Sequence, residues 1–321
     1  MIKIQLSSES MNEIRKIHWQ DMRNQGTGLV KVLETKEAKD LLISEVRYAE
    51  LYSYFYDIND NVIVKNVKKL LLANKKELEE FIKKFGTFSE SESKKLTDVI
   101  FRYNTFSGRK SAYDILRLEN VTVCPYCNRQ YIFTLENNKV RPQFDHYYPK
   151  SIYPYLALSI FNLIPSCSIC NQAKSTLDTY KEPILYPFEE EFGDEVRFVI
   201  NSDDIKYLHG MTDDFDMGIR LEGIDSSKVN KIDKQDERLH LMELYDKHKD
   251  YVKDIAWNHH INSEERINEI MKRFPGMFLT KEDATSTIYM NDIRKEKLGK
   301  RPLAKLTRDI YRELEIKKWN L

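Results

Sequence analysis

Cys124-Pro125-Tyr126-Cys127 is matched further along the chain by Cys167-Ser168-Ile169-Cys170, and these two C-x-x-C pairs use all four cysteines of the protein. Four thiolates arranged in two such pairs form a closed tetrahedral shell, which selects zinc in a structural role. We therefore predict a structural zinc ion bound by Cys124, Cys127, Cys167 and Cys170. The alternative is thiol–disulfide chemistry at a C-x-x-C pair. The absence of a βαβ pattern around either pair disfavours it.

The stretch between the two pairs predicts a compact strand, strand, helix unit. Residues 129–135 alternate well enough for a strand, and residues 136–139 have the composition of a turn. Residues 140–146 are then expected to form the returning strand, which Pro149 stops. Asn171, directly after the last cysteine, is a good helix cap.

The polar residues of this unit have the chemistry of phosphodiester cleavage. His146 has an ordinary pKa near neutrality (about 6.5), so it can accept a proton from water at physiological pH. Asp145 and Asn171 offer oxygen ligands of the kind that Mg²⁺ or Mn²⁺ prefers. Lys174 lies three residues after Asn171 on the same predicted helix face and is expected to hold a phosphate. Neighbouring strand residues point to opposite faces, so Asp145 and His146 share a site only if the strand ends or twists there.

Together these residues resemble the HNH endonuclease family, which has the ββα-metal, or His-Me finger, core. The resemblance covers about residues 118–186 and implies that His146 is the general base. It also implies that Asp145 and Asn171 bind the catalytic metal and that Asn162 orients the site loop through backbone hydrogen bonds. Many members carry the same four-cysteine zinc site. The letters HNH stand for the three motif residues of the family, and in this chain the third of them is Asn171 instead of His. This difference favours Mg²⁺ or Mn²⁺ bound through oxygen ligands.

The sequence around Cys124 and Asp145 is similar to that of bacterial HNH proteins from anti-phage defence loci, including Septu-type and retron-linked systems. Some of those proteins work beside an ABC- or SMC-like ATPase. This chain has no Walker motif, because Gly299-Lys300 lacks the required glycine five residues earlier. The resemblance therefore implies a separate ATPase subunit as a candidate partner.

The overall charge is balanced, with 51 Lys and Arg against 51 Asp and Glu, so it gives no global sign of nucleic-acid binding. The local charge differs, because residues 101–175 contain nine Lys or Arg and four Asp or Glu. This excess agrees with a polyanionic substrate. We place DNA ahead of RNA, although no residue of the sequence distinguishes the two. The expected phosphate contacts, each of which can also be an ordinary surface charge, are Arg129, Arg141, Lys150 and Lys174.

The whole chain predicts an α+β fold in three regions. Residues 1–118 read as mostly helical, residues 119–185 as the HNH core with its zinc, and residues 186–321 as short strands followed by helices that position a substrate or partner. In the last region we expect strands at residues 196–200, 205–208 and 219–221 and one long helix over residues 226–257. Further helices are expected at residues 264–273 and 303–316.

Two surface features have more than one interpretation. The tyrosine-rich run at residues 48–56 either packs between helices or stacks nucleic-acid bases. The ten acidic residues between Glu189 and Asp216 form a solvated sheet face, a docking surface for a basic partner, or a negative guard near the active site.

The N-terminal residues have no long apolar region and no apolar stretch spans a bilayer, so we expect neither a signal peptide nor a membrane span. We therefore expect a cytoplasmic protein.

The sequence leaves two functions from different classes open. The first is a metal-dependent HNH endonuclease. The second is a non-catalytic zinc module that binds nucleic acid or a protein, which has no need for the Asp145, His146 and Asn171 set.

Overall fold

The computed structural model describes residues 1–135, 140–202, 206, 211–212 and 214–318. It confirms an α+β fold in which helices predominate and the strands form two small antiparallel sheets. The chain divides into two compact units, each built from separated stretches. We call them the N-terminal unit (residues 4–121 and 132–183) and the C-terminal unit (residues 1–3, 122–131 and 184–321). This division cuts across the three regions expected from the sequence.

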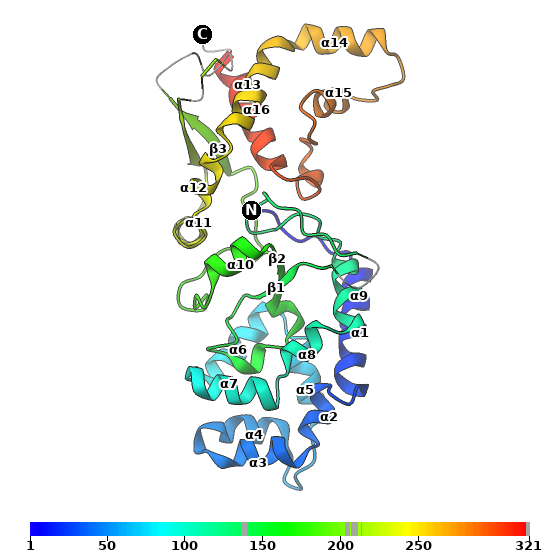
Figure 1. Ribbon diagram of the computed structural model, residues 1–321, viewed down its shortest axis with the longest axis vertical. Coiled ribbons are helices and arrows are strands. Elements are labelled where there is room, and N and C mark those ends of the chain that lie inside the picture. Colours follow the sequence, from blue (N-terminus) through cyan, green and yellow to red (C-terminus); the bar gives the residue numbers. More distant parts are fainter. Residues whose placement is uncertain (136–139, 203–205, 207–210, 213, 319–321) are drawn as a thin grey trace. The chain divides into compact units, whose positions relative to one another are not determined.

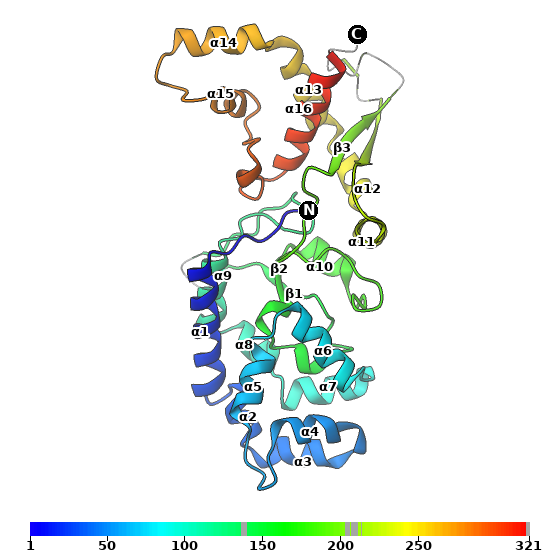
Figure 2. The same ribbon diagram turned by 180° about the vertical axis from the view of Figure 1, so that it is seen from behind.

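The N-terminal unit begins with a series of helices, as the sequence predicts for residues 1–118 (Figure 1). In both views α1 lies along α9 (Figures 1 and 2). The helical elements are α1 (Ser8–Asn24), α2 (Leu29–Leu33), α3 (Lys36–Ser44), η1 (Val46–Tyr48), α4 (Ala49–Phe55), α5 (Val64–Leu71), α6 (Lys75–Phe85), α7 (Glu90–Val99), α8 (Tyr103–Ser107) and α9 (Lys110–Glu119).

Capping residues set several of these helix starts. Ser89 accepts a hydrogen bond from the backbone N–H of Glu92, and the side chain of Glu92 accepts from the backbone N–H of Ser89, so this reciprocal pair sets the start of α7. Asn74 and Glu77 form the same reciprocal pair at the start of α6. This cap separates α6 from α5.

The tyrosine-rich run packs inside the N-terminal unit. Tyr48, Tyr54, Phe55 and Tyr56 are all buried, and Tyr54 contacts the rings of Phe81 and Phe85 edge to face. The packing interpretation of this run is therefore confirmed for these residues.

The second part of the N-terminal unit has the order strand, strand, helix. The elements are β1 (Gln143–His146), η2 (Pro154–Leu156), η3 (Ile160–Asn162), β2 (Leu163–Ser166) and α10 (Ser168–Lys174). The strands pair antiparallel, with Asp145 opposite Ile164 and His146 opposite Leu163.

The strand predicted at residues 129–135 is not formed, and the returning strand is confirmed only at Gln143–His146. The backbone N–H of Leu135 does donate to the carbonyl of Val140 at 3.0 Å, while the predicted turn at residues 136–139 lies outside the described residues. Residues 123 and 131 instead form an isolated bridge, because a tight turn at Asn128 sends the chain back on itself. The buried Asn128 side chain donates to the carbonyl of Leu298 and accepts from the backbone of Lys305, which fixes that turn in the C-terminal unit.

The C-terminal unit contains the second sheet and the remaining helices (Figure 2). Its elements are β3 (Val196–Asn201), β4 (Asp216–Leu221), α11 (Ser226–Leu239), α12 (Leu241–Asp246), α13 (Lys249–Ile261), α14 (Glu264–Arg273), α15 (Lys281–Ile288), η5 (Lys295–Lys297) and α16 (Ala304–Lys318). The strands predicted at residues 196–200 and 219–221 are confirmed, whereas most of the strand at 205–208 lies outside the described residues.

The single long helix predicted over residues 226–257 is wrong, because the chain forms α11, α12 and α13 in its place. His240 adopts the left-handed conformation with φ 50°, which ends α11. The side chain of Asp236 then accepts the backbone N–H of Met242, so the break has its own hydrogen bond.

Much of the acidic segment is neutralised by cations of its own unit. Asp194 lies 3.0 Å from Arg308 and 3.0 Å from Arg312, and Glu190 lies 2.5 Å from Lys231. Residues 203, 204 and 213 of this segment lie outside the described residues. The paired acids therefore serve the packing of the C-terminal unit.

Within the described part of the chain, no helix is both long enough and apolar enough to cross a bilayer.

Glu119, the last residue of α9, gives a testable consequence of burial. The side chain is buried, its Oε2 has no hydrogen-bond partner, and desolvation raises the pKa of the carboxyl from 4.5 to about 8. The folded protein therefore binds more protons than the unfolded chain between these pH values, so stability is lost as pH rises through that window. We expect Glu119→Gln to be more stable than the parent at pH 8, by up to about 4 kcal/mol.

Urea unfolding of both proteins between pH 4.5 and pH 8 measures this difference. The two free energies of unfolding should converge at the acidic end. Glu80→Gln, at an exposed position of α6, is the matched control and should follow the parent. A Glu119→Gln protein with the parent's pH dependence would contradict the assignment.

Candidate functional site

An open cavity of about 610 Å³ lies in the N-terminal unit beside β1 and α10. Three of the residues with predicted catalytic roles border it, namely Asp145 and His146 from β1 and Asn171 from α10. Two predicted phosphate contacts border it as well, Arg141 and Lys150. Other lining residues were not predicted from the sequence, and of these Tyr103 from α8 and Gln143 from β1 make the most informative contacts.

The end of β1 explains how two neighbouring residues reach one cavity. His146 is the last residue of the strand, and the next backbone N–H, that of Tyr147, donates to the carbonyl of Asn162 at 2.8 Å. Strict alternation of faces applies only within a regular strand. His146 lies at the very end of the strand, where the alternation of faces no longer holds. Asp145 and His146 can therefore both line the cavity.

The imidazole of His146 is held in one tautomer. Its Nε2 lies 3.1 Å from the carbonyl oxygen of Ala157, and a carbonyl only accepts, so Nε2 carries the hydrogen. The other nitrogen, Nδ1, therefore keeps its lone pair. The ring of Tyr103 packs edge to face on the imidazole with centroids 4.4 Å apart, which limits rotation of the ring.

The environment of His146 keeps the ring neutral. Burial, reinforced by the positive charges of Lys150 and Lys174, lowers its pKa from 6.5 to about 3, although the bond to Ala157 acts in the opposite direction. This pKa differs from the near-neutral value expected from the sequence and makes the imidazole a weaker base, whereas its geometry still leaves the Nδ1 lone pair able to accept a proton.

Asn162 organises the loop between β1 and β2. Its Oδ1 accepts the backbone N–H of Tyr148 at 2.8 Å, and its Nδ2 donates to the carbonyls of Tyr148 at 3.0 Å and Leu156 at 3.1 Å. The side chain is completely buried, so all three bonds replace water. This amide therefore fixes the path of the loop whose Ala157 carbonyl holds His146.

We expect Asn162→Ala to destabilise the protein by about 1–3 kcal/mol, because it leaves buried backbone groups without partners. If the protein is the nuclease expected from the sequence, its cleavage rate per folded molecule should fall as well, since the loop whose Ala157 carbonyl bonds His146 loses its internal bonds. Thermal unfolding and the cleavage rate measured on the same preparation test both effects. Asn66→Ala, which removes a bond to the backbone of Tyr54 in another part of the N-terminal unit, is the control and should leave the rate unchanged. An unchanged rate in Asn162→Ala would contradict the role of the loop.

Asn171 is oriented by a residue of β1. Its Nδ2 donates to Oε1 of Gln143 at 2.7 Å, which leaves Oδ1 as the acceptor atom of the amide. An amide carbonyl oxygen and the carboxylate of Asp145 are hard donors, the type that Mg²⁺ and Mn²⁺ select. Asp145 and Asn171 therefore offer the cavity two oxygen donors of this type.

Lys174 does not present its ammonium to solvent, contrary to its predicted role as a phosphate contact. Its side chain is fully buried, and Nζ donates to Oδ1 of Asp145 at 3.1 Å and to the carbonyl of His146 at 2.7 Å. Helical spacing placed Lys174 one turn from Asn171 correctly but gave no information on burial.

The other predicted phosphate contacts differ in position. Lys150 lies with Nζ 4.5 Å from the ring centre of Tyr103, and Arg141 lies 5.7 Å from the ring centre of Phe144. Both are partly exposed at the cavity. Arg129 belongs to the C-terminal unit, where its Nε donates to His248 at 3.0 Å, and it is not among the residues that line the cavity.

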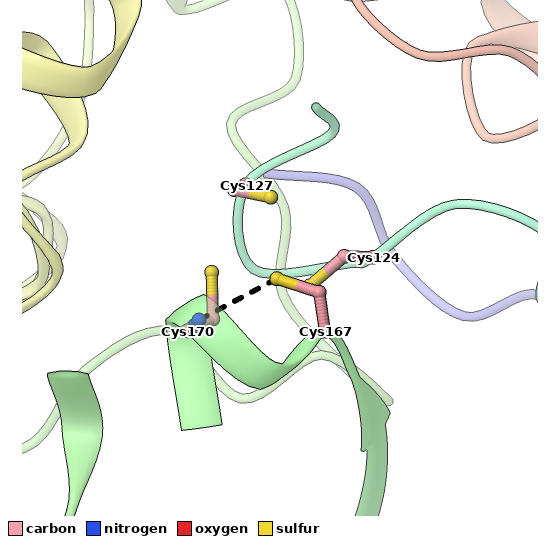
Figure 3. A group of neighbouring side chains, drawn as sticks. All are labelled: Cys124, Cys127, Cys167 and Cys170. Atoms are coloured by element: carbon pink, nitrogen blue, oxygen red, sulfur yellow. Dashed lines mark hydrogen bonds between the residues drawn. The ribbon is translucent and has the colours of Figure 1, made fainter. Parts of the chain in front are cut away.

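The four cysteines form a group whose geometry fits zinc (Figure 3). Their sulfur atoms all lie within 4.8 Å of one another, all four side chains are buried, and none forms a disulfide. Tetrahedral zinc with Zn–S bonds of about 2.3 Å separates its sulfurs by about 3.8 Å. No other group of three or more potential His, Cys, Asp or Glu ligands comes this close among the described residues.

Backbone N–H groups support the sulfurs as hydrogen-bond acceptors. The N–H of Cys170 donates to Sγ of Cys167 at 3.4 Å, drawn as a dashed line in Figure 3, and the N–H of Arg129 donates to Sγ of Cys127 at 3.4 Å. Such bonds favour the thiolate form that binds a metal. Cys124, Cys127, Cys167 and Cys170 are therefore able to hold one zinc ion.

Comparison with known proteins gives a partial similarity. The chain is 39% identical over 64 residues to "Septu protein PtuB" from Bacillus thuringiensis. The match covers 20% of this chain and 23% of that protein, so about a quarter of the relative's length is represented. No protein-family model matches the chain, and no solved structure matches it.

Proposed function

We propose that the protein is a metal-dependent HNH endonuclease that hydrolyses phosphodiester bonds in nucleic acid. The observation that carries the proposal is the cavity shared by Asp145, His146 and Asn171, where the bond from Nε2 of His146 to Ala157 leaves the lone pair on Nδ1. A binding module has no requirement for a fixed proton acceptor beside two oxygen donors. The strand, strand, helix order of β1, β2 and α10 agrees with the HNH resemblance.

Asp145 and Asn171 would hold one Mg²⁺ or Mn²⁺ through the carboxylate and the amide carbonyl. When bound, such an ion supplies positive charge that stabilises the transition state at phosphorus. The remaining chemistry belongs to the side chains of the chain itself.

His146 accepts a proton at Nδ1 from the water that attacks phosphorus. The water oxygen forms the new P–O bond as the bond to the leaving sugar oxygen breaks, and that oxygen takes up a proton. Ala157 and Tyr103 keep the imidazole in place during this step.

Arg141 and Lys150 are the proposed contacts to substrate phosphates, since both border the cavity and retain exposed surface. Contacts of this kind give affinity without reading sequence. We place DNA ahead of RNA as the substrate, on the strength of the resemblance to defence nucleases.

The similarity to a Septu protein supports a role in anti-phage defence. A separate ABC- or SMC-like ATPase is the proposed partner, because the chain has no Walker motif of its own. Co-purification of a tagged chain with the product of a neighbouring ATPase gene tests this partnership.

The substrate is identified by incubating purified protein with plasmid DNA, single-stranded DNA and total RNA. Each is tested with Mg²⁺, with Mn²⁺ and with EDTA. We expect cutting of DNA that requires a divalent ion. Binding to these nucleic acids without any cutting, in the presence of the ATPase partner as well, would favour the non-catalytic zinc module.

A further inference from the structure

The ammonium of Lys174 is placed where a phosphate cannot reach it. Lys174 is the last residue of α10, its side chain is fully buried, and its two hydrogen-bond acceptors belong to β1. One is the carboxylate of Asp145 and the other is the backbone carbonyl of His146. Lys174 therefore contacts both of the neighbouring residues to which the proposed function assigns metal binding and proton transfer.

Two residues of α10, one helical turn apart, form hydrogen bonds to β1. Asn171 donates to the side chain of Gln143 at the start of β1, and Lys174 donates to Asp145 and His146 at its end. Residues three apart share one face of a helix, so a single face of α10 carries both contacts. The position of the strand relative to Asn171 is thus set by these two side chains.

Stability alone does not account for this pair. Burying a lysine and an aspartate has a desolvation cost that their mutual attraction offsets only partly. Apolar residues of similar size at such positions often give the same protein stability. The long, flexible stem and three donors of a lysine do allow one side chain to bind a carboxylate and a backbone carbonyl at once.

We propose that Lys174 is a positioning residue, which holds the Asp145 carboxylate in the orientation that receives the catalytic metal. This inference rests on the proposed function. By holding the His146 carbonyl as well, Lys174 fixes the end of β1, where two adjacent residues turn to the same cavity. A residue that supports a metal ligand in this way commonly changes metal affinity about 10–100-fold when it is replaced.

Lys174→Met removes the donors while keeping the length of the side chain. We expect Mn²⁺ to bind at least about tenfold more weakly by isothermal titration calorimetry. In the cleavage assay kcat should fall by a similar factor, while KM for nucleic acid stays close to that of the parent. Lys181→Met, at an exposed lysine of the same unit, is the matched control and should change none of these values.

A second variant guards against loss of folding. Lys174→Met removes the Lys174 ammonium from the buried Asp145 carboxylate, so Lys174→Met/Asp145→Asn removes the carboxylate charge too. We expect the double variant to recover thermal stability, which would identify the buried carboxylate as the cause of any instability in Lys174→Met. Mn²⁺ affinity is compared only between the parent and folded Lys174→Met, because Asp145→Asn removes a proposed ligand of the ion.

The results that overturn the inference are distinct. A raised KM with unchanged Mn²⁺ affinity would make Lys174 a phosphate contact. Unchanged or tighter Mn²⁺ binding with unchanged kcat would make the ion pair structural only. If the parent protein neither binds Mn²⁺ nor cuts nucleic acid, the proposed function fails, and the inference that rests on it fails with it.

Discussion

His146→Ala is expected to reduce the rate of nucleic-acid cleavage by about 10²–10⁴-fold, because it removes the group that accepts the proton of the attacking water. Folding should change little, since the imidazole makes a single hydrogen bond, to Ala157, and borders an open cavity. Binding of nucleic acid should persist, because Arg141 and Lys150 remain in place. Single-turnover cleavage rates, thermal unfolding and a gel-shift titration measure these three quantities.

His260→Ala is the matched control for this substitution. His260 is an exposed histidine near the end of α13, outside the residues that line the cavity, so its removal should leave the rate unchanged. A His146→Ala protein that cuts at the parental rate would remove His146 from the mechanism. Equal losses in the two variants would point to a general effect on the protein.

Cys170→Ser is expected to abolish zinc binding and to lower the free energy of unfolding by about 4 kcal/mol or more, because a structural zinc ion contributes its binding energy to folding. The serine oxygen is a poor substitute for a thiolate ligand of zinc. Cys124→Ser should behave in the same way, since all four sulfurs belong to one group. Zinc content by elemental analysis and thermal unfolding test the expectation.

Two controls separate zinc from other roles of the cysteines. Ser168→Ala, at an exposed position between the cysteines of the second pair, should keep both the zinc and the stability. The parent protein treated with a strong chelator should unfold like Cys170→Ser. A stability that depends on reductant or oxidant instead of the chelator would support the thiol–disulfide interpretation.

The residues of the candidate site could be predicted from the sequence because they lie close together along the chain and their side-chain types suggest the chemistry. The C-x-x-C spacing fixes how two sulfurs reach one ion, and the four sulfurs do come together. Asp145, His146 and Asn171 lie in the same stretch of chain as those cysteines, and all three border the cavity. Their catalytic roles remain predictions.

The strand that pairs with β1 could not be predicted from the sequence, because the pairing joins residues that are distant along the chain. The partner strand β2 contains Pro165, a residue that normally argues against a strand. A sheet of only two strands leaves one edge of each strand unpaired, and there the missing N–H of Pro165 costs little. The sequence pattern instead pointed to residues 129–135, which the turn at Asn128 diverts.

The burial of charged residues could not be predicted from the sequence either. Lysine is seldom fully buried, so Lys174 was expected at the surface, yet its ion pair with Asp145 lies inside the protein. Tyr103 was missed for a related reason, since only the folded chain brings α8 against His146. Helical periodicity shows which face of a helix is apolar but not which charged residue finds a buried partner.

The rate of DNA cleavage by the purified, zinc-loaded protein in Mg²⁺, in Mn²⁺ and in EDTA is the most decisive measurement of nuclease function. We expect cutting with either ion and none without a divalent ion, because the proposed ligands Asp145 and Asn171 carry no positive charge that could replace it. Thermal unfolding in the same EDTA buffer is the control, since a chelator that removes zinc from the four cysteines would stop cutting by unfolding the protein. Cutting that persists in EDTA would contradict a metal-dependent site. Failure to cut DNA or RNA in either metal, alone or with the ATPase partner, would contradict the assignment as a nuclease.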